Sequence, residues 1–173
     1  PLFVSVNVSP RQLRSGDLPD VVAECLRDTG LPASRLHLEL TETAVISDEA
    51  HASALLATLH RTGVKVWLDD FGTGFSGLSH LRRVPVDGVK IDRGIVIESA
   101  LPRAHALLEG MIRLSHDMGI RVLCEGVEDK ATCDAVLAAG CDFIQGFYFS
   151  RVLPWREAES FLRSLAARDR GEG

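Results

Sequence analysis

The stretch VKVWLDDFGTG at residues 64–74 joins an apolar run to two adjacent carboxylates and a glycine-rich turn. The run Val64–Leu68 predicts a buried strand that ends where the pair Asp69-Asp70 begins. Two carboxylates this close resist joint ionisation, and a divalent metal is the neutraliser that we expect. One or two such cations would suit phosphate chemistry.

Similar apolar runs recur on both sides of this strand, and helical patterns lie between them. Most runs are nearly continuous instead of strictly alternating, which is typical of parallel strands covered by helices. Strand alternating with helix predicts an α/β fold with a parallel sheet. The strand candidates are Phe3–Val8, Leu36–Leu40, Val64–Leu68, Val86–Ile91, Ile120–Cys124 and Phe143–Phe147.

The helical stripes repeat at the spacing of one buried helix face. We expect Asp17 to cap the first helix, and four glycines, at 30, 63, 119 and 140, to stop helices just before strands. The expected helical segments are 18–26, 52–59, 76–82, 107–115, 130–139 and 155–165.

Composition sets the broad class of protein. The chain has 173 residues, 46% of them hydrophobic and 25% charged, which fits one globular domain. Its net charge of −5 leaves no basic field for a nucleic-acid polymer. We expect a domain over residues 1–165 and a polar tail over 166–173. Because Pro1 leads almost directly into a strand, we also expect the chain to begin inside a larger protein.

The cysteines and the hydropathy indicate a compartment. The four cysteines form no C-x-x-C pair and no zinc-like spacing, so a reducing, cytoplasmic setting fits best. Cys25 and Cys124 lie within apolar patterns and are predicted to be buried. No apolar run approaches about 20 residues, so no membrane contact is expected from this segment.

Each strand candidate carries polar residues at its C-terminal end. In a parallel barrel these ends meet on one face, where the active sites of such barrels lie. The inventory is rich in hard oxygen ligands and has one cation, without thiolate or imidazole, which indicates a hard-oxygen metal site. The residues are Asn7, Glu39 with Glu42, Asp69-Asp70, Lys90 with Asp92, Glu125 with Glu128, and Gln145.

Each of these residues also has a simpler interpretation. A strand-end acid is often a helix cap or a solvated charge, and Asn7 alone would be a turn residue. Lys90 alone would be a surface lysine or a partner of Asp92, and Gln145 a loop hydrogen-bonding group. The recurrence at six strand ends favours a shared site.

A dinucleotide fingerprint competes for the same segment. Residues 72–77 match G-x-G-x-x-G, and Asp92 follows 20 residues after Gly72 (92 − 72), where a ribose-binding acid is expected. However, Asp69 and Asp70 would then face a pyrophosphate without compensation. We therefore interpret the glycines as allowing a sharp loop over the site.

The ordered motifs resemble those of EAL-domain cyclic-di-GMP phosphodiesterases. The similarity rests on LDDFGTGFSGLSHLRRVPVDGVKID at 68–92, together with shorter blocks along nearly the whole chain. These blocks are VSVNVSPRQL at 4–13, LELTET at 38–43, CEGVE at 124–128 and QGFYFSRVLP at 145–154.

The resemblance implies a TIM-type (β/α)8 barrel, of which about six βα units are present here. It implies hydrolysis of cyclic di-GMP to linear pGpG with two Mg²⁺ or Mn²⁺ ions, a step that ends a bacterial second-messenger signal. Asn7, Glu39 and Asp69 would bind the first metal, and Asp69 would bridge to a second held by Asp70 and Glu125.

The resemblance also implies roles around the metals. Lys90 would position or activate the attacking water, and Gln145 would orient it. Glu42 would anchor the loop Phe71–Ser76, which includes Gly72, Thr73 and Gly74 and leads towards a dimer interface. Asp92 and Glu128 would not bind metal themselves but would support the residues that do.

One departure from the family pattern keeps an alternative open. The Glu-Ala-Leu motif and the strands that normally precede Asn7 are absent from the sequence. The alternative is an inactive EAL-like module that senses cyclic di-GMP or docks a protein. A homodimer, and upstream sensory or GGDEF-type domains in the parent protein, are further expectations from the resemblance.

Overall fold

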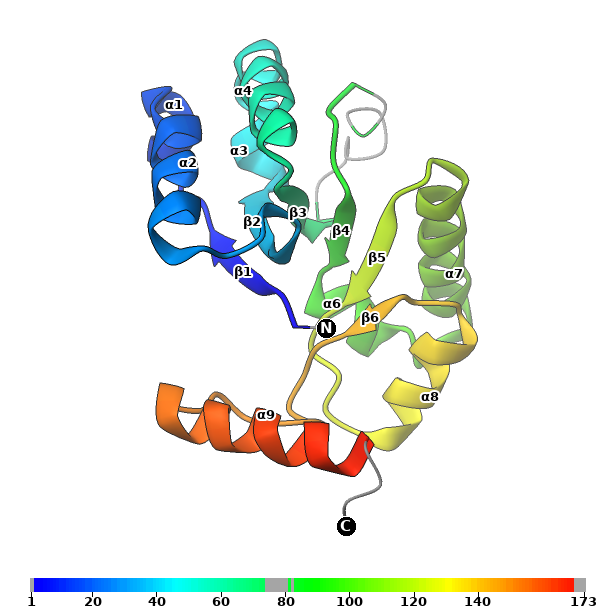
Figure 1. Cartoon of the computed structure of the whole chain (residues 1–173). Helices are drawn as coiled ribbons and strands as arrows, with labels where there is room; N and C mark the ends of the chain where they lie inside the picture. The colour runs from blue at the N-terminus through cyan, green and yellow to red at the C-terminus, as the bar shows by residue number, and fades with distance from the viewer. Residues whose placement is uncertain (1, 74–80, 82, 170–173) are drawn as a thin grey trace.

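Six parallel strands form one sheet in their order along the chain, β1-β2-β3-β4-β5-β6 (Figure 1). The structure is a computed structural model that describes residues 2–73, 81 and 83–169. The predicted α/β fold with a parallel sheet is confirmed. The strands are β1 (Val4–Asn7), β2 (Leu36–Thr41), β3 (Lys65–Phe71), β4 (Gly88–Ile91), β5 (Arg121–Cys124) and β6 (Phe143–Ile144).

Helices follow β1, β2, β4 and β5 and cover the outside of the curved sheet, while α9 lies apart from them (Figure 1). The long helices match the predicted stripes. The short helices α1, α3 and α6 were not expected, because five or six residues are too few to show a helical period. The helices are α1 (Pro10–Ser15), α2 (Leu18–Thr29), α3 (Glu42–Ile46), α4 (Glu49–Thr62), α6 (Arg93–Glu98), α7 (Pro102–Asp117), α8 (Lys130–Ala138) and α9 (Trp155–Asp169), with a 3-10 turn at Ala33–Arg35.

Successive side chains of each strand point alternately to the hydrophobic core and to the concave face that carries the site. In β2, Leu38 and Leu40 join the hydrophobic core, whereas His37 and Glu39 point to the opposite, concave face. On that face an aromatic cluster links the two edges of the sheet. The Phe3 ring lies 4.1 Å from His37 and 5.8 Å from Phe143 between centroids. The sheet is therefore rolled into a partial barrel.

The structure corrects several strand predictions. β3 does not end at Leu68 but continues through the acidic pair to Phe71, with a register shift between Leu68 and Phe71 against β4. β6 spans only Phe143–Ile144 and stops short of Phe147. β1 is an exposed edge strand and is not covered on both faces. Edge position and bulges depend on neighbouring strands, so the local pattern could not show them.

Other local predictions also change. Cys25 is exposed, although Cys124 is buried as predicted. Asp17 precedes α2 without capping it through its side chain, which accepts a hydrogen bond from the Ser15 hydroxyl instead. Trp155 in the last stripe is 73% exposed, and α9 runs on to Asp169, into the stretch expected to be a tail. The helix expected at 76–82 lies mostly outside the described residues.

No helix in the described part of the chain has both the length and the apolar character needed to cross a bilayer.

Candidate active site

Lys90 is the centre of the site on the concave face. Its ammonium Nζ lies 2.8 Å from Glu39 Oε2, 3.1 Å from Asp69 Oδ1 and 2.7 Å from Glu125 Oε1. These residues come from β4, β2, β3 and the end of β5, so parallel pairing alone brings them together. The Lys90 side chain is only 5% exposed, which excludes the surface-lysine interpretation.

The charges in this cluster do not balance. Three carboxylates share one ammonium, which leaves two negative charges when all are ionised. Burial works to lower the pKa of Lys90, but hydrogen bonds to Glu125 and Glu39 outweigh it and raise that pKa, so the lysine stays charged. Burial raises the pKa of Glu125 despite the opposing hydrogen bond from Lys90. A bound cation would offset this surplus negative charge.

The donor chemistry fits a hard divalent cation. All of the converging ligands are carboxylate oxygens, and Asn7 is in register with Glu39 on the neighbouring strand. Within the described residues, however, no three His, Cys, Asp or Glu side chains form a metal-holding group. The carboxylates point to Lys90 instead of to a common vacant centre. Oxygen donors of this kind suit Mg²⁺, Mn²⁺ or Ca²⁺.

Asp70 lies in strained backbone beside the cluster. Its φ of 57° places it in the left-handed region, where residues other than glycine are uncommon. Burial, followed by the charges of Asp69 and Asp92, raises the pKa of Asp70. The register shift between Leu68 and Phe71 interrupts the regular alternation of side chains at this acidic pair.

Glu42 connects the site to the loop after β3. It is the first residue of α3, is 4% exposed, and accepts a hydrogen bond of 3.3 Å from the Gly72 backbone N–H through Oε2. Its Oε1 is buried without a hydrogen-bond partner among the described residues. Gly72 has a φ of 95°, and a Cβ there would lie 2.6 Å from both Ile95 and Met111. The turn therefore requires glycine.

The remaining loop residues are placed as follows. Phe71 is buried, and the Thr73 hydroxyl donates a hydrogen bond to the Asp70 carbonyl at 2.9 Å. Gly74 and Ser76 lie outside the described residues.

Asp92 and Glu128 do not contact Lys90. Asp92 caps α6 by accepting a hydrogen bond of 2.8 Å from the Gly94 N–H. Glu128, in the loop after β5, forms an ion pair of 2.8 Å with Arg93, the first residue of α6. Both residues thus hold the segments that follow β4 and β5 and do not extend the carboxylate cluster.

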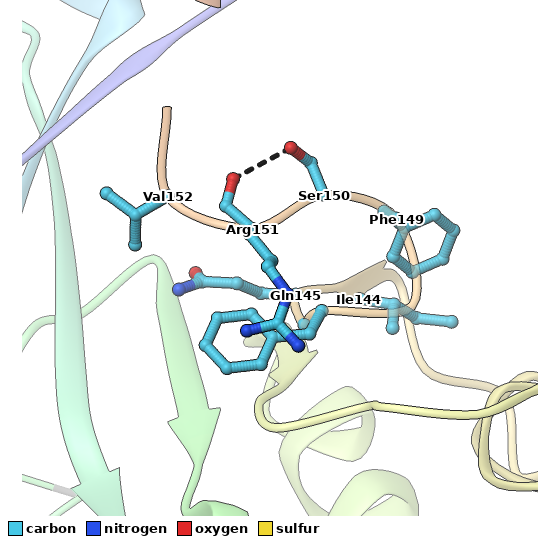
Figure 2. Close-up of a pocket in the computed structure, with 8 residues that line it drawn as sticks. Ile144, Gln145, Phe149, Ser150, Arg151 and Val152 are labelled. Carbon is cyan, nitrogen blue, oxygen red and sulfur yellow. Dashed lines mark hydrogen bonds between the residues drawn. The ribbon is translucent and has the colours of Figure 1, made fainter. Parts of the chain in front are cut away.

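Gln145 lies between two hollows beside the cluster. One, of about 180 Å³, is lined by Glu125, Gln145 and Phe147 among others. The other, of about 350 Å³, lies under the loop at 147–152, where Arg151 reaches back towards Gln145 (Figure 2). The Arg151 guanidinium carbon is 5.3 Å from the centroid of the Phe147 ring. We did not predict Phe147 and Arg151 as site residues, because only the turn of the loop brings them together.

The fold and the site define a partial α/β barrel with an acidic, lysine-centred site at the C-terminal ends of its strands. The chain belongs to the EAL domain family, whose model matches residues 1–152.

Among curated relatives, the chain is similar to the cyclic di-GMP phosphodiesterase NbdA of Pseudomonas aeruginosa. The two are 36% identical over 164 residues, which are 94% of this chain and 21% of NbdA. The chain spans about a fifth of the length of the curated relatives it matches.

Solved structures share the architecture. The EAL domain of Mycobacterium smegmatis DcpA has a TM-score of 0.88 and 36% identity, covering 94% of this chain and 73% of that one. Klebsiella pneumoniae BlrP1, solved as calcium and manganese complexes with cyclic di-GMP, has a TM-score of 0.81 and 32% identity, covering 86% of this chain and 38% of that one. The predicted family and the barrel-type fold are confirmed.

Proposed function

We propose that this chain supplies the metal-dependent site that hydrolyses cyclic di-GMP to linear pGpG. The observation that carries the proposal is the convergence of Glu39, Asp69 and Glu125 on Lys90 in a buried, anionic centre. A phosphodiester has little intrinsic affinity for such a centre, so bound cations are needed to bring the two together.

We propose a ligand set for two metals. Asn7, Glu39 and Asp69 would hold one cation, and Asp69 would be shared with a second held by Asp70 and Glu125. When bound, such a pair of cations lowers the pKa of a water and stabilises the oxygens of an in-line displacement. The manganese and calcium complexes of BlrP1 support a divalent ion, and we propose Mg²⁺ or Mn²⁺ here.

Lys90 and Gln145 would act on the reacting groups themselves. Lys90 carries a compact positive charge that can orient a water and offset charge that develops on the phosphate. Gln145 sits at the edge of the cluster, in the hollow that also includes Glu125, where its amide can orient the same water. Glu42 would position the loop that follows Asp69-Asp70 through its bond to Gly72.

A base of the dinucleotide would use the adjoining hollow. The Phe147 ring is half exposed, and Arg151 lies over it beside Gln145. Aromatic rings and guanidinium planes stack on nucleobases without reading their sequence. We propose that Phe147 and Arg151 form a base-stacking platform next to the hydrolytic centre.

Incubation of the full-length protein with cyclic di-GMP and Mg²⁺, followed by chromatography, tests the proposal. We expect pGpG as the product and its loss after treatment with EDTA. Glu39→Ala and Lys90→Ala should each abolish turnover, whereas Glu24→Ala on the exposed face of α2 should not. Turnover that survives Glu39→Ala would refute the proposal. Tight binding without any product would instead identify the non-hydrolytic sensor that the sequence left open.

Assembly and location are further proposals. The greater length of the curated relatives is consistent with sensory or GGDEF-type domains in the parent protein. A homodimer remains a prediction from the family, which sedimentation of the full-length protein would test. Hydrolysis of an intracellular messenger would place this chain in the cytoplasm.

A further inference from the structure

A separate cavity of about 400 Å³ lies at the N-terminal ends of the strands. It is lined by Lys65 and Arg121, the first residues of β3 and β5, and by His37, near the start of β2. Lys65 precedes Asp69 by four residues, so about 13 Å of strand separates this cavity from the carboxylate cluster. Nothing in the proposed hydrolysis uses it.

One buried polar atom in the cavity wall, the indole Nε1 of Trp67, lacks a hydrogen-bond partner among the described residues. Trp67 is 3% exposed, and its indole Nε1 is buried with no partner among the described residues. His37 is 7% exposed, and its ring stacks on Trp67 at 5.5 Å without a hydrogen bond in the described part of the chain. The imidazole ring of His37 offers at least one N–H in either protonation state. A buried donor such as the Trp67 indole N–H is unfavourable without an acceptor, and an acceptor ligand would relieve this.

The charges around the cavity favour an anion. Asp87 is the only carboxylate in the described lining, and its two oxygens are already engaged. Oδ1 accepts a hydrogen bond from Lys65 at 2.8 Å, and Oδ2 accepts from His60 and from the Val66 N–H, both at 2.9 Å. Arg121 has no ion pair within the described residues. The lining therefore combines a fully engaged carboxylate with an available guanidinium.

We propose that this cavity binds a small tetrahedral anion, namely phosphate or the phosphate group of a small metabolite. Arg121 would supply the main charge, with Lys65 at the rim, while the Trp67 and His37 N–H groups would donate from the wall. Donors that approach from several elements suit a tetrahedral anion better than a planar carboxylate, which a single guanidinium can bind in a bidentate manner. The volume leaves room for an organic group beyond the phosphate.

Fluorine NMR of the full-length protein labelled with fluorotryptophan tests the proposal, since Trp67 lies in the wall. The signal is assigned with Trp67→Phe, and inorganic phosphate is titrated in EDTA so that no metal holds phosphate at the carboxylates. We expect a saturating shift of the Trp67 signal at about 1 mM phosphate, with no shift of the exposed Trp155. Sulfate should reproduce the shift, and acetate should not.

Two arginine variants, one in the cavity lining and one on the surface of α7, test whether phosphate binds in this cavity. Arg121→Gln should weaken phosphate binding at least about tenfold, the scale of one lost charge-assisted contact, while Arg103→Gln on the surface of α7 should leave it unchanged. An unchanged circular dichroism spectrum would show that both variants fold. No shift up to about 10 mM phosphate, or an equal response in Arg121→Gln, would overturn the proposal. So would a crystal structure of the full-length protein with its own side chains filling the cavity.

Discussion

The ammonium of Lys90 lies 2.8 Å from Oε2 of Glu39, although their strands β4 and β2 are separated in the sheet by β3. The contact crosses the concave face, where Asp69 of the intervening strand also reaches Lys90. The lysine therefore compensates charge that would otherwise keep these carboxylates apart, and this has consequences for stability as well as for turnover.

Removal of the Lys90 charge should destabilise the protein mainly when metal is absent. Lys90→Met leaves three partly buried carboxylates uncompensated, and breaking such a pair costs about 3–5 kcal/mol. We expect Mg²⁺ to restore more stability in the variant than in the wild type, because cations then take over the compensation. Thermal unfolding with EDTA or Mg²⁺ measures this. Lys130→Met, which breaks an exposed helical ion pair, is the control. An equal response to Mg²⁺ in wild type and Lys90→Met would contradict the prediction.

Loss of the Glu42 carboxylate should slow turnover, although Glu42 is not a proposed metal ligand. Glu42→Ala removes the acceptor of the Gly72 N–H, so we expect turnover to fall about tenfold or more while dinucleotide affinity changes little. Glu42→Gln retains an oxygen acceptor and should recover part of the rate. Steady-state kinetics on the full-length enzyme separates kcat from KM. A loss confined to KM would argue against a positioning role.

The stacking platform predicts an effect on affinity. Phe147→Ala should weaken cyclic di-GMP binding about 10- to 100-fold, because stacking of one base is worth about 1–3 kcal/mol. Tyr148→Ala is the matched control, since Tyr148 is similarly exposed but does not line the hollow beside Gln145. Calorimetric titration of a catalytically dead background measures both. Equal affinities of the two variants would exclude Phe147 from base binding.

Trp67 and Gly88 form a size-matched pair in neighbouring strands. A Cβ at Gly88 would lie 2.5 Å from the Trp67 ring, so Gly88→Ala should cost about 1–3 kcal/mol of unfolding free energy. In a Trp67→Leu background the same substitution should cost much less. Gly110→Ala, in an α7 position with open space, should be neutral or slightly stabilising. Urea denaturation of the wild type, Gly88→Ala, Trp67→Leu, the double variant and the Gly110→Ala control measures the coupling free energy between positions 67 and 88. Additive costs would mean that the ring and Gly88 do not interact.

Asp87 should contribute to the acid limit of stability. Burial works to raise the pKa of Asp87, but the bonds from Lys65 and the Val66 N–H outweigh it and lower that pKa. Because the folded pKa lies below the unfolded one, the stabilisation is present above about pH 4 and disappears as the pH falls through the folded pKa. Asp87→Asn should therefore lose about 1–3 kcal/mol at pH 7, and the loss should shrink as the pH falls below about 4.

Urea unfolding of Asp87→Asn between pH 3 and 7 measures this dependence. Asp28→Asn on α2, an exposed position, serves as the control. A difference between Asp87→Asn and wild type that stays constant with pH would show that hydrogen bonding and not charge explains the effect.

Local sequence was enough to predict the sheet and most of the site. Long apolar runs and helical stripes depend only on neighbouring residues, and parallel strands necessarily gather their C-terminal ends. The sequence alone therefore places Glu39, Asp69, Lys90 and Glu125 on one face. The short helices could not be predicted, because five or six residues show no helical period. The extension of β3 through Asp70 could not be predicted either, because a bulge depends on the partner strand.

Only the tertiary structure decided which groups touch. Residues as distant in sequence as Glu39 and Glu125 share the Lys90 ammonium, and the return of a loop lays Arg151 over Phe147. The unpartnered indole of Trp67 also becomes visible only once β2, β4 and β6 surround it. Residue type and local spacing determine which elements form and which edge carries chemistry. Distances, burial and charge balance arise from contacts between distant segments, which no local pattern encodes.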